Sequence, residues 1–258
     1  MDNSLSANLH VLVSACQKVS RFMIRDFGEV EQLQTSVNGA DNFVSASQLK
    51  AEKILTDTLL EARERYGVMS PNGEIKGLDI SHRFIINVSD GVENFKRGLP
   101  FFTISVALQE QKNLIASVVY SPVLDKMFFA EKGTGCFVSE TRMTRRIRVS
   151  SRRDLEGNTI MIAGSNCDVD LKGARKIDVA SSGLSLGYVA AGMADAFIAK
   201  KKNVFDLAAG LLLIKEAGGL IRSYDANKNE TQDVFSADVV VCGNSYLQSE
   251  IKSCILGK

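Results

Sequence analysis

The stretch from Arg83 to Leu108, RFIINVSDGVENFKRGLPFFTISVAL, constrains the fold more than any other part of this chain. The apolar run Phe84–Ile86 predicts a buried strand, which ends at a polar turn containing Asp90 and Gly91. A second strand is expected from Phe102 to Leu108, where apolar residues alternate again. The stretch therefore predicts two neighbouring strands joined by a turn that carries a carboxylate.

The turn allows two interpretations. An acidic residue and a glycine at the exit of a buried strand can hold a cation, and the backbone N–H groups that follow can bind an anion. The same pair is also the commonest composition of an ordinary turn. Both interpretations stay open on this stretch alone.

The overall charge excludes some classes of partner. The 258 residues carry a formal net charge of +1, so no global field attracts the protein to nucleic acid or to an anionic membrane. We therefore expect neither direct DNA binding nor membrane association. The basic run from Arg142 to Arg153 predicts a solvent-exposed strand and linker, with nucleic acid or an acidic partner as the alternative.

The cysteines and the N-terminus bear on the compartment. No two cysteines form a CxxC pair, which is typical of reduced thiols in a cytosolic protein. The cysteines are Cys16, Cys136, Cys167, Cys242 and Cys254. The first residues lack the basic start and apolar core of a signal peptide, and no apolar run reaches the ~20 residues needed to cross a bilayer. We expect a cytoplasmic protein.

The first half of the chain predicts helices beside a meander of strands. Apolar residues at helical spacing indicate helices at Asn8–Phe27, ending at Gly28, and at Ser47–Tyr66. The segment between them is polar and turn-like, and Val68–Ser81 is expected to be a loop. Further strands are expected at residues 114–120 and 126–131. This pattern favours an α+β half that spans residues 1–149 and contains the turn.

The second half, residues 150–258, alternates between strands and helices. Strands are expected at residues 159–163, 196–199, 220–223 and 239–242. Helices are expected at residues 184–194 and 207–217 and from 244 towards 254. Such alternation is the signature of a layered α/β half. We expect the two halves to form a single compact unit.

Four separated segments resemble signatures of the inositol monophosphatase family. Phe84–Phe95 is similar to the motif W-x-x-D-P-[IL]-D-G-T-x-N-F, and Phe205–Gly219 is similar to W-D-x-A-A-G followed by E-A-G-G. Tyr188–Asp195 resembles the helix Y-V-A-A-G-x-x-D, and Val44–Glu52 resembles V-T-x-x-D-x-x-x-E. The likeness spans almost the whole chain in the same order, and it is strongest to the bacterial SuhB members.

The resemblance implies a fold, a reaction and partners. The fold would be a layered αβαβα sandwich, usually in a homodimer. The reaction would be hydrolysis of a phosphomonoester such as an inositol phosphate, in which carboxylates hold Mg²⁺ ions that activate water and neutralise the phosphoryl oxygens. SuhB members are also associated with transcription complexes, so the implied partners are a phosphorylated small molecule and a transcription-complex protein.

The family's charged site residues match this sequence only in part. Asp90 and Asp206 match two metal carboxylates. Asn87 stands at the position of the first Asp of the family motif, where it removes a negative charge. Val92 replaces the Thr that positions the nucleophilic water, and Gln48 replaces the acidic partner of that Thr. Gln48 cannot act as an anion or general base.

Other positions of the family site also differ. The G-E-E metal loop of the family falls on Met69–Asn72, where no carboxylate is in register, although Glu74 is close enough for a shifted loop to present it. Ala199 stands where the family has a substrate-contacting Glu, and Phe205 replaces a Trp. The phosphate would bind the backbone N–H groups of Gly91 and Val92.

Our leading hypothesis is a SuhB-like phosphatase homologue whose chemistry is severely weakened or absent and whose role is binding or regulation. A working hydrolase with a reduced one-metal site, using Asp90, Asp206 and Glu74 with Asn87 as a poor ligand, is the second hypothesis. An anion-binding module is the third. Asp90 and Asp206 could equally persist as a turn residue and a helix N-terminal residue.

Overall fold

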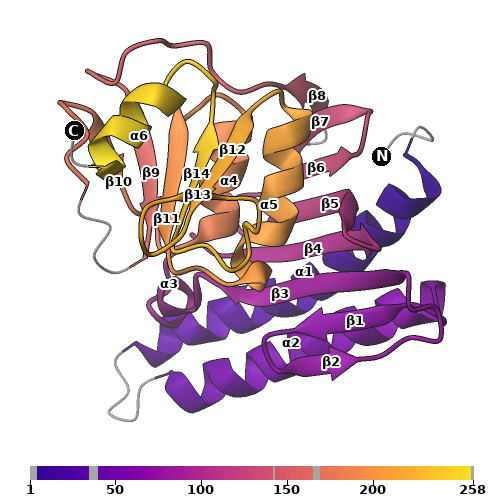
Figure 1. Ribbon diagram of the computed structural model, residues 1–258. Helices are drawn as coiled ribbons and strands as arrows, with labels where there is room; N and C mark the ends of the chain where they lie inside the picture. Colours follow the sequence, from indigo (N-terminus) through magenta and orange to yellow (C-terminus); the bar gives the residue numbers. More distant parts are fainter. Residues whose placement is uncertain (1–4, 35–39, 142, 165–168, 257–258) are drawn as a thin grey trace.

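In the computed structural model, which describes residues 5–34, 40–141, 143–164 and 169–256, layers of helix and sheet alternate (Figure 1). Helices α1 and α2 cover one sheet, α4 and α5 lie between the two sheets, and α6 lies on the outer face of the second sheet. The helices are α1 (Ala7–Leu33), α2 (Asp41–Ala62), α3 (Val92–Lys96), α4 (Ser182–Ala190), α5 (Val204–Glu216) and α6 (Gln248–Leu256). The layered αβαβα sandwich expected from the resemblance is therefore confirmed.

The first sheet lies within the N-terminal part of the chain. Its strands are β1 (Gly67–Ser70), β2 (Gly73–Ile75), β3 (His82–Asp90), β4 (Thr103–Glu110), β5 (Asn113–Ser121), β6 (Lys126–Glu131), β7 (Gly135–Glu140) and β8 (Met143–Ile147). Their order is β2-β1-β3-β4-β5-β6-β7-β8, and all neighbours are antiparallel except β1 and β3. The meander predicted from the sequence forms the centre of this sheet.

The second sheet is mixed and belongs to the C-terminal part. Its strands are β9 (Thr159–Ala163), β10 (Arg175–Ile177), β11 (Ala196–Lys200), β12 (Leu220–Tyr224), β13 (Glu230–Thr231) and β14 (Val239–Gly243). Their order is β10-β9-β11-β14-β12-β13. The central strands are buried on both faces, which explains why β9, β11 and β14 are short continuous apolar runs in the sequence.

The alternation of side chains along each strand divides the core between layers. On β3, Phe84 and Ile86 pack towards α1 and α2, whereas Ile85 packs towards the layer of α4 and α5. On β14, Cys242 faces that same central layer, and Val241 faces α6 on the other side. Since successive side chains of a strand point to opposite faces, each sheet contributes to two cores.

A β-bulge interrupts β3 where the polar turn begins. Asn87 pairs with Ser105 of β4, but Asp90 pairs with Thr103, so the register shifts by one residue between Asn87 and Asp90. In a regular strand these two side chains, three positions apart, would point to opposite faces of the sheet. The extra residue brings both to the face that packs on α4 and α5.

Several helix boundaries differ from the prediction, and those of α1 and α2 show why. α1 continues past Gly28 to Leu33, because Val30 is fully buried in the core beyond the glycine and this packing outweighs the ~1 kcal/mol that glycine costs inside a helix. α2 begins at Asp41 rather than Ser47. Val44 is fully buried, and Asp41 lies in the first turn, where a carboxylate stabilises the helix dipole.

Three further segments complete the comparison with the prediction. The expected loop Val68–Ser81 begins instead as the hairpin of β1 and β2. The expected helix at residues 184–194 is α4, which begins two residues earlier, at Ser182, and ends at Ala190. Part of the basic run forms the largely exposed strand β8, while Arg142 lies outside the described residues.

Four of the five cysteines lie within the described residues. Cys16, Cys136 and Cys242 are buried and unpaired, Cys254 is half-buried, and Cys167 lies outside the described residues. In the part of the chain that the structure describes, no helix combines the length and apolar character needed to cross a bilayer.

Candidate functional site

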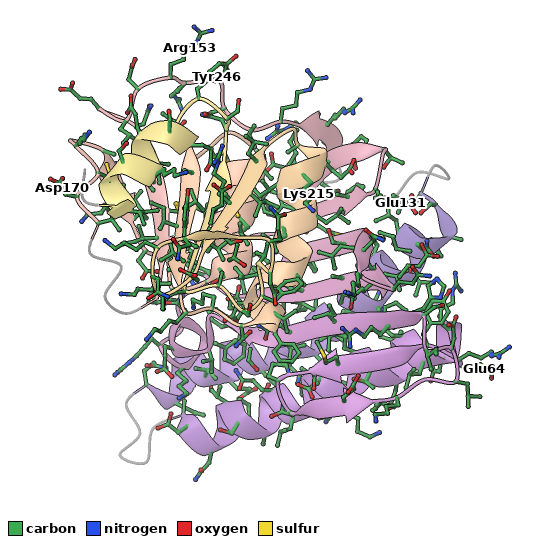
Figure 2. The ribbon with its side chains drawn as sticks, viewed as in Figure 1. Glu64, Glu131, Arg153, Asp170, Lys215 and Tyr246 are labelled. Atoms are coloured by element: carbon green, nitrogen blue, oxygen red, sulfur yellow. The ribbon has the colours of Figure 1, made fainter. Side chains whose placement is uncertain are left out.

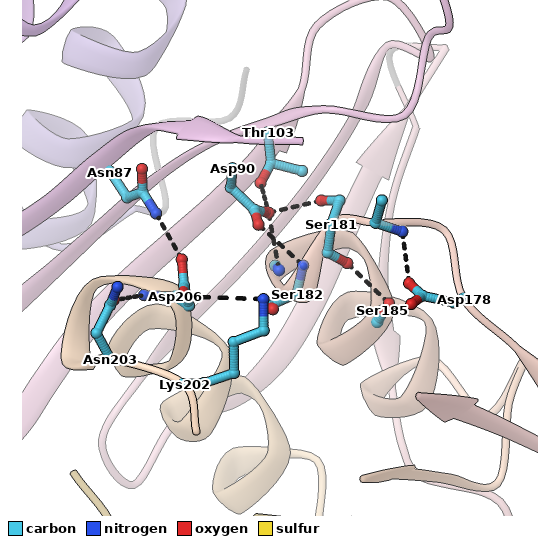
Figure 3. A network of polar contacts seen from close by, with 12 residues as sticks. Asn87, Asp90, Thr103, Asp178, Ser181, Ser182, Ser185, Lys202, Asn203 and Asp206 are labelled. Atoms are coloured by element: carbon cyan, nitrogen blue, oxygen red, sulfur yellow. Dashed lines mark hydrogen bonds and ion pairs between the residues drawn. The ribbon is translucent and has the colours of Figure 1, made fainter. Parts of the chain in front are cut away.

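Three of the residues singled out in the sequence, Asn87, Asp90 and Asp206, meet where β3 ends against the N-termini of two central helices (Figure 3). Asn87 and Asp90 come from β3 and its bulge, and Asp206 comes from the first turn of α5. The start of α4, at Ser181 and Ser182, faces Asp90. The fold thus brings Asp90 and Asp206 together from the two halves of the chain.

The Asp90 carboxylate is surrounded by hydrogen-bond donors. Its Oδ2 accepts from the hydroxyls of Thr103 at 2.7 Å and Ser181 at 2.5 Å and from the amide N–H of Gly183 at 2.9 Å. Its Oδ1 accepts from the amide N–H of Ser182 at 2.9 Å. The residue is only 7% exposed, so protein donors replace water around this charge.

These contacts give Asp90 a structural role at the start of α4. The first N–H groups of a helix have no partner within the helix, and a carboxylate that binds them also stabilises the helix dipole. Ser181 is the N-cap of α4 and accepts from the Leu184 N–H, so the cap and Asp90 together satisfy the first turn. Asp90 therefore connects β3 to α4 through a helix-capping network.

Gly183 is required by the same network. A Cβ atom at this position would lie 2.7 Å from the Thr103 hydroxyl oxygen and 3.0 Å from Asp90 Oδ2. The absence of a side chain lets the start of α4 approach the carboxylate closely.

Asp206 has a different environment. Its Oδ1 accepts from the Asn87 Nδ2 at 3.1 Å, and its Oδ2 lies 4.0 Å from the Lys202 ammonium. The Asn87 amide is held in this orientation because its Oδ1 accepts from the Ser89 N–H at 2.8 Å. Asn203, the N-cap of α5, accepts from the Asp206 N–H. The cation nearest to the Asp206 carboxylate is thus a lysine of the same chain.

Burial raises the pKa of Asp206, and the nearby Asp90 charge raises it further. The Lys202 ammonium, the second largest influence after burial, lowers that pKa but does not cancel the effect of burial. The carboxylate therefore lies in a partly desolvated pocket with one ammonium beside it.

The loop at Met69–Asn72 is tied to α2. The Ser70 hydroxyl donates to Glu52 Oε1 at 2.6 Å, and the Asn72 amide donates to Glu52 Oε2 at 2.8 Å. Glu74 lies on the exposed strand β2 and approaches Arg83 at 3.6 Å. Arg83 is seven residues before Asp90 on β3, a separation of roughly 23 Å along a strand. The structure does not bring Glu74 to Asp90 and Asp206.

The turn after Asp90 has a backbone geometry that requires glycine. Gly91 has φ of 83°, and a Cβ atom there would lie 2.4 Å from the Phe101 carbonyl oxygen. Val92 begins α3 and packs partly against the core of α1 and α2. The Asn94 amide donates to the carbonyls of Phe101 and Val179, both at 2.7 Å, and so joins the turn to the segment before α4.

The remaining positions matched to the family lie apart from these contacts. Gln48 is half-buried on α2. Ala199 is buried in β11, within the central core, and Phe205 is partly buried at the start of α5.

As arranged here, these residues do not present a magnesium ligand set. Mg²⁺ prefers near-octahedral coordination by oxygen atoms with available lone pairs. Both oxygens of Asp90 already accept protein donors, and Asp206 faces an amide N–H and an ammonium. Within the described ranges, no three or more His, Cys, Asp or Glu side chains are grouped so that they could hold a metal ion.

Sequence reasoning missed the residues that engage the two carboxylates. Ser181 could have been found as an N-cap, since serine before a run of small apolar residues is a helix-start signal. Lys202 lies four residues before Asp206, the spacing at which charges at a helix start interact. Nothing in the sequence indicates that Thr103 faces Asp90, because the bulge decides which side chains share that face.

Comparison with known proteins agrees with the fold. The model of the inositol monophosphatase family matches residues 5–257. An inositol-1-monophosphatase of Mesorhizobium japonicum is 36% identical, over 97% of this chain and 96% of its own length. The Nus factor SuhB of Xylella fastidiosa is 31% identical, over 83% of this chain and 80% of its own length. The crystal structure of the extragenic suppressor protein SuhB from Bartonella henselae superposes with a TM-score of 0.85 at 33% identity, covering 97% of this chain and 100% of that one.

Proposed function

The chain belongs to the inositol monophosphatase family, and we propose that it binds a phosphomonoester or a partner protein without carrying out efficient magnesium-dependent hydrolysis. The observation that carries this proposal is the Asp90 network, in which four protein donors occupy a carboxylate that would otherwise be a metal ligand. A Mg²⁺ ion on Oδ2 would have to displace hydrogen bonds that also hold the start of α4.

The chemical step lacks further groups. Asn87 brings a neutral amide where the family has a carboxylate, and its N–H is directed at Asp206. Val92 has no hydroxyl to position a water molecule, and Gln48 has no carboxylate to deprotonate it. Removing a single transition-state donor typically costs ~10²–10³-fold in rate, and groups that act as a unit are not replaced one at a time. Turnover should be many decades below that of a working relative.

Binding is better supported than turnover. The Lys202 ammonium lies beside Asp206 with 27% of its side chain exposed, so it can approach a phosphoryl oxygen as a cation that needs no metal. The first N–H groups of α3, after Gly91, have no partner within the helix and are available to the same anion. A phosphorylated small molecule of the inositol phosphate class is the ligand that this arrangement fits.

A working hydrolase with a reduced one-metal site is the second candidate. It is favoured by the 36% identical relative named as an inositol-1-monophosphatase and by the proximity of Asp90 and Asp206. In this case Mg²⁺ would bind Asp206 with water in most other positions, and Lys202 would move away.

The decisive experiment measures release of phosphate from inositol 1-phosphate with and without Mg²⁺, together with calorimetric titration of Mg²⁺. We expect no magnesium-dependent turnover and no heat of binding at ~1 mM metal, where a site of ordinary affinity would already be occupied. Phosphate release that requires Mg²⁺ and disappears in Asp206→Asn would contradict the proposal. Asp206→Asn is preferred to Asp90→Asn here, because the latter also disrupts the α4 cap. The same titration with inositol 1-phosphate in EDTA should show binding that Lys202→Ala weakens.

We also propose a homodimer in the cytoplasm that contacts a protein of the transcription machinery. The transcription partner is supported by the similarity to relatives named Nus factor SuhB, at 31% identity for the Xylella fastidiosa protein, and the homodimer and the compartment by membership of the family. Light scattering would report the mass in solution, and a pull-down with purified transcription factors would report the partner. A monomer at micromolar concentration would contradict the homodimer. A pull-down that retains no transcription factor would contradict the proposed partner.

A further inference from the structure

A second concave site lies at the opposite end of α5 from Asp206. It is a cavity of about 890 Å³ between the β4–β5 hairpin, the turn after β6, the C-terminal half of α5, and β12 with the segment from β13 to Phe235. Asp206 and Lys215 are nine residues apart on α5, which places the cavity roughly 13 Å along the helix from the first site. The volume lies in the range of ligand sites, about 300–1,000 Å³.

Apolar residues line the interior of this cavity between α5 and β12, whereas most of the remaining lining is polar or charged. Leu211 and Leu212 of α5 are almost fully buried, and Ile221 of β12, Val234 and Phe235 are partly buried beside them. Partly buried apolar side chains that line a concavity lose their remaining contact with water when an apolar group enters. This part of the cavity suits an aromatic or aliphatic ligand body.

Three lysines stand around the cavity: Lys112 in the β4–β5 hairpin, Lys132 after β6, and Lys215 on α5. Figure 2 shows Lys215 projecting from α5 on the side where β6 ends at Glu131. Among the residues that the structure describes, none of these three ammonium groups has an ion-pair or hydrogen-bond partner. Lysines on a concave rim without partners raise the local concentration of anions.

The carboxylates around the cavity are already engaged. Glu216 accepts from the amide N–H groups of Gly133 at 2.9 Å and Gly135 at 3.0 Å. Glu230 pairs with Arg222 and Lys252, and Asp233 accepts from the Phe235 N–H. Hydrogen bonds from N–H groups leave the charges of Glu216 and Asp233 in place, so the cations of the lining, which include Arg222, exceed its carboxylates by a single charge.

We propose that this cavity binds an organic polyphosphate with a planar or apolar body, the chemistry of a nucleoside triphosphate. The body would occupy the apolar interior between α5 and β12, and the phosphates would lie against Lys112, Lys132 and Lys215. Lysine binds phosphate as a point charge, so three of them around one opening suit a chain of phosphates better than a single carboxylate. The site is separate from the one that contains Asp90 and Asp206.

The test is isothermal titration of the full chain with ATP in EDTA, with inorganic triphosphate and adenosine as separate probes. We expect one ATP per chain, bound more tightly than either probe alone, because the body and the phosphates contribute separately. Lys215→Glu should weaken ATP binding about tenfold or more, the value of one charge-assisted contact. Val234→Asp, which places a carboxylate in the apolar interior, should weaken binding of ATP and of adenosine.

Lys76→Glu is the matched control, because Lys76 is exposed, has no ion-pair partner in the described part of the chain and lies outside the cavity. Its ATP affinity should stay within about twofold of the parent value, and thermal unfolding should show that all variants are folded. The proposal is overturned if ATP does not bind at about 1 mM, or if Lys215→Glu and Val234→Asp both bind as the parent does. It is also overturned if Lys202→Ala, rather than Lys215→Glu, abolishes binding, since the nucleotide would then occupy the first site.

Discussion

Replacing Asp90 with Asn should destabilise the protein in the complete absence of metal. The amide keeps the shape of the carboxylate but loses its charge and one acceptor. If its oxygen takes the place of Oδ2, it still accepts from Thr103, Ser181 and Gly183, while the amide nitrogen faces the Ser182 N–H, donor against donor.

The magnitude follows from these contacts. Bonds to a charged acceptor contribute about twice as much as neutral ones, so three bonds each lose of order 1 kcal/mol. The Ser182 N–H loses its partner, which costs a further 1–3 kcal/mol or so, and relief from burying a charge offsets part of the sum. We expect a net loss of about 3 kcal/mol. For a chain of this size that corresponds to a fall in Tm of roughly 10 °C.

The assay is thermal unfolding of parent and Asp90→Asn protein in EDTA and again in excess MgCl₂. Asp57→Asn is the control, because Asp57 is an exposed carboxylate that pairs with Lys53 within α2 and should cost under about 0.5 kcal/mol. A carboxylate kept for metal binding should behave in the opposite way, since removing its repulsion leaves the metal-free protein unchanged or more stable. A Tm for Asp90→Asn in EDTA equal to or above that of the parent would refute the capping role. A rise in the parent Tm with MgCl₂ that Asp206→Asn abolishes would show that these carboxylates bind the metal.

Three further predictions concern other parts of the chain. Hydrogen bonds from the Ser81 side chain and backbone lower the pKa of Asp79 to about 2. The charged carboxylate therefore stabilises the fold fully above pH 3.8, its ordinary pKa, and this contribution is lost as the pH falls through about 2. An NMR titration should give the lowered pKa, and Ser81→Ala should move it back towards 3.8. Burial raises the pKa of the Cys16, Cys136 and Cys242 thiols, that of Cys136 to about 12. In the native protein a thiol reagent should therefore label these three far more slowly than the half-buried Cys254. Labelling of all four at equal rates without denaturant would contradict the burial. The halves 1–149 and 150–258 should unfold in one calorimetric transition, because α5 of the second half packs on β3 and β5 of the first, and two resolved transitions would show that they are independent.

Much of the fold could be predicted because its signals are local. The strands at residues 126–131 and 159–163 have the predicted bounds, since each is a short apolar run between turn residues. Boundaries failed where distant packing outweighs local preference, as at Gly28, where a glycine that would ordinarily end a helix lies inside α1 because the next turn is buried.

Of the candidate site, only the two carboxylates that accept hydrogen bonds could be predicted from the sequence. Sequence motifs identified Asp90 and Asp206, and the structure places them together. Three of the four groups that engage Asp90 come from Ser181, 91 residues further along the chain, and from its two successors, and the fourth is the Thr103 hydroxyl. A pattern of residue types cannot report whether a carboxylate faces water, metal or amide N–H groups, because that depends on how the two sheets and the helices between them pack. Lys202 was overlooked for a related reason, since a lysine before a helix is ordinarily solvated.

The bulge on β3 means that the site depends on the length of the strand as well as on its residues. Deleting Ser89 would restore the regular alternation and rotate the Asp90 side chain to the opposite face of the sheet. There it would enter the layer where Phe27, Phe95 and Phe102 pack with ring centroids 4.8–5.5 Å apart, which offers a carboxylate no donor among these rings. A substitution at this turn alters single hydrogen bonds of the site. A change of one residue in its length would instead move the Asp90 side chain from the core around α4 and α5 to the core around α1 and α2.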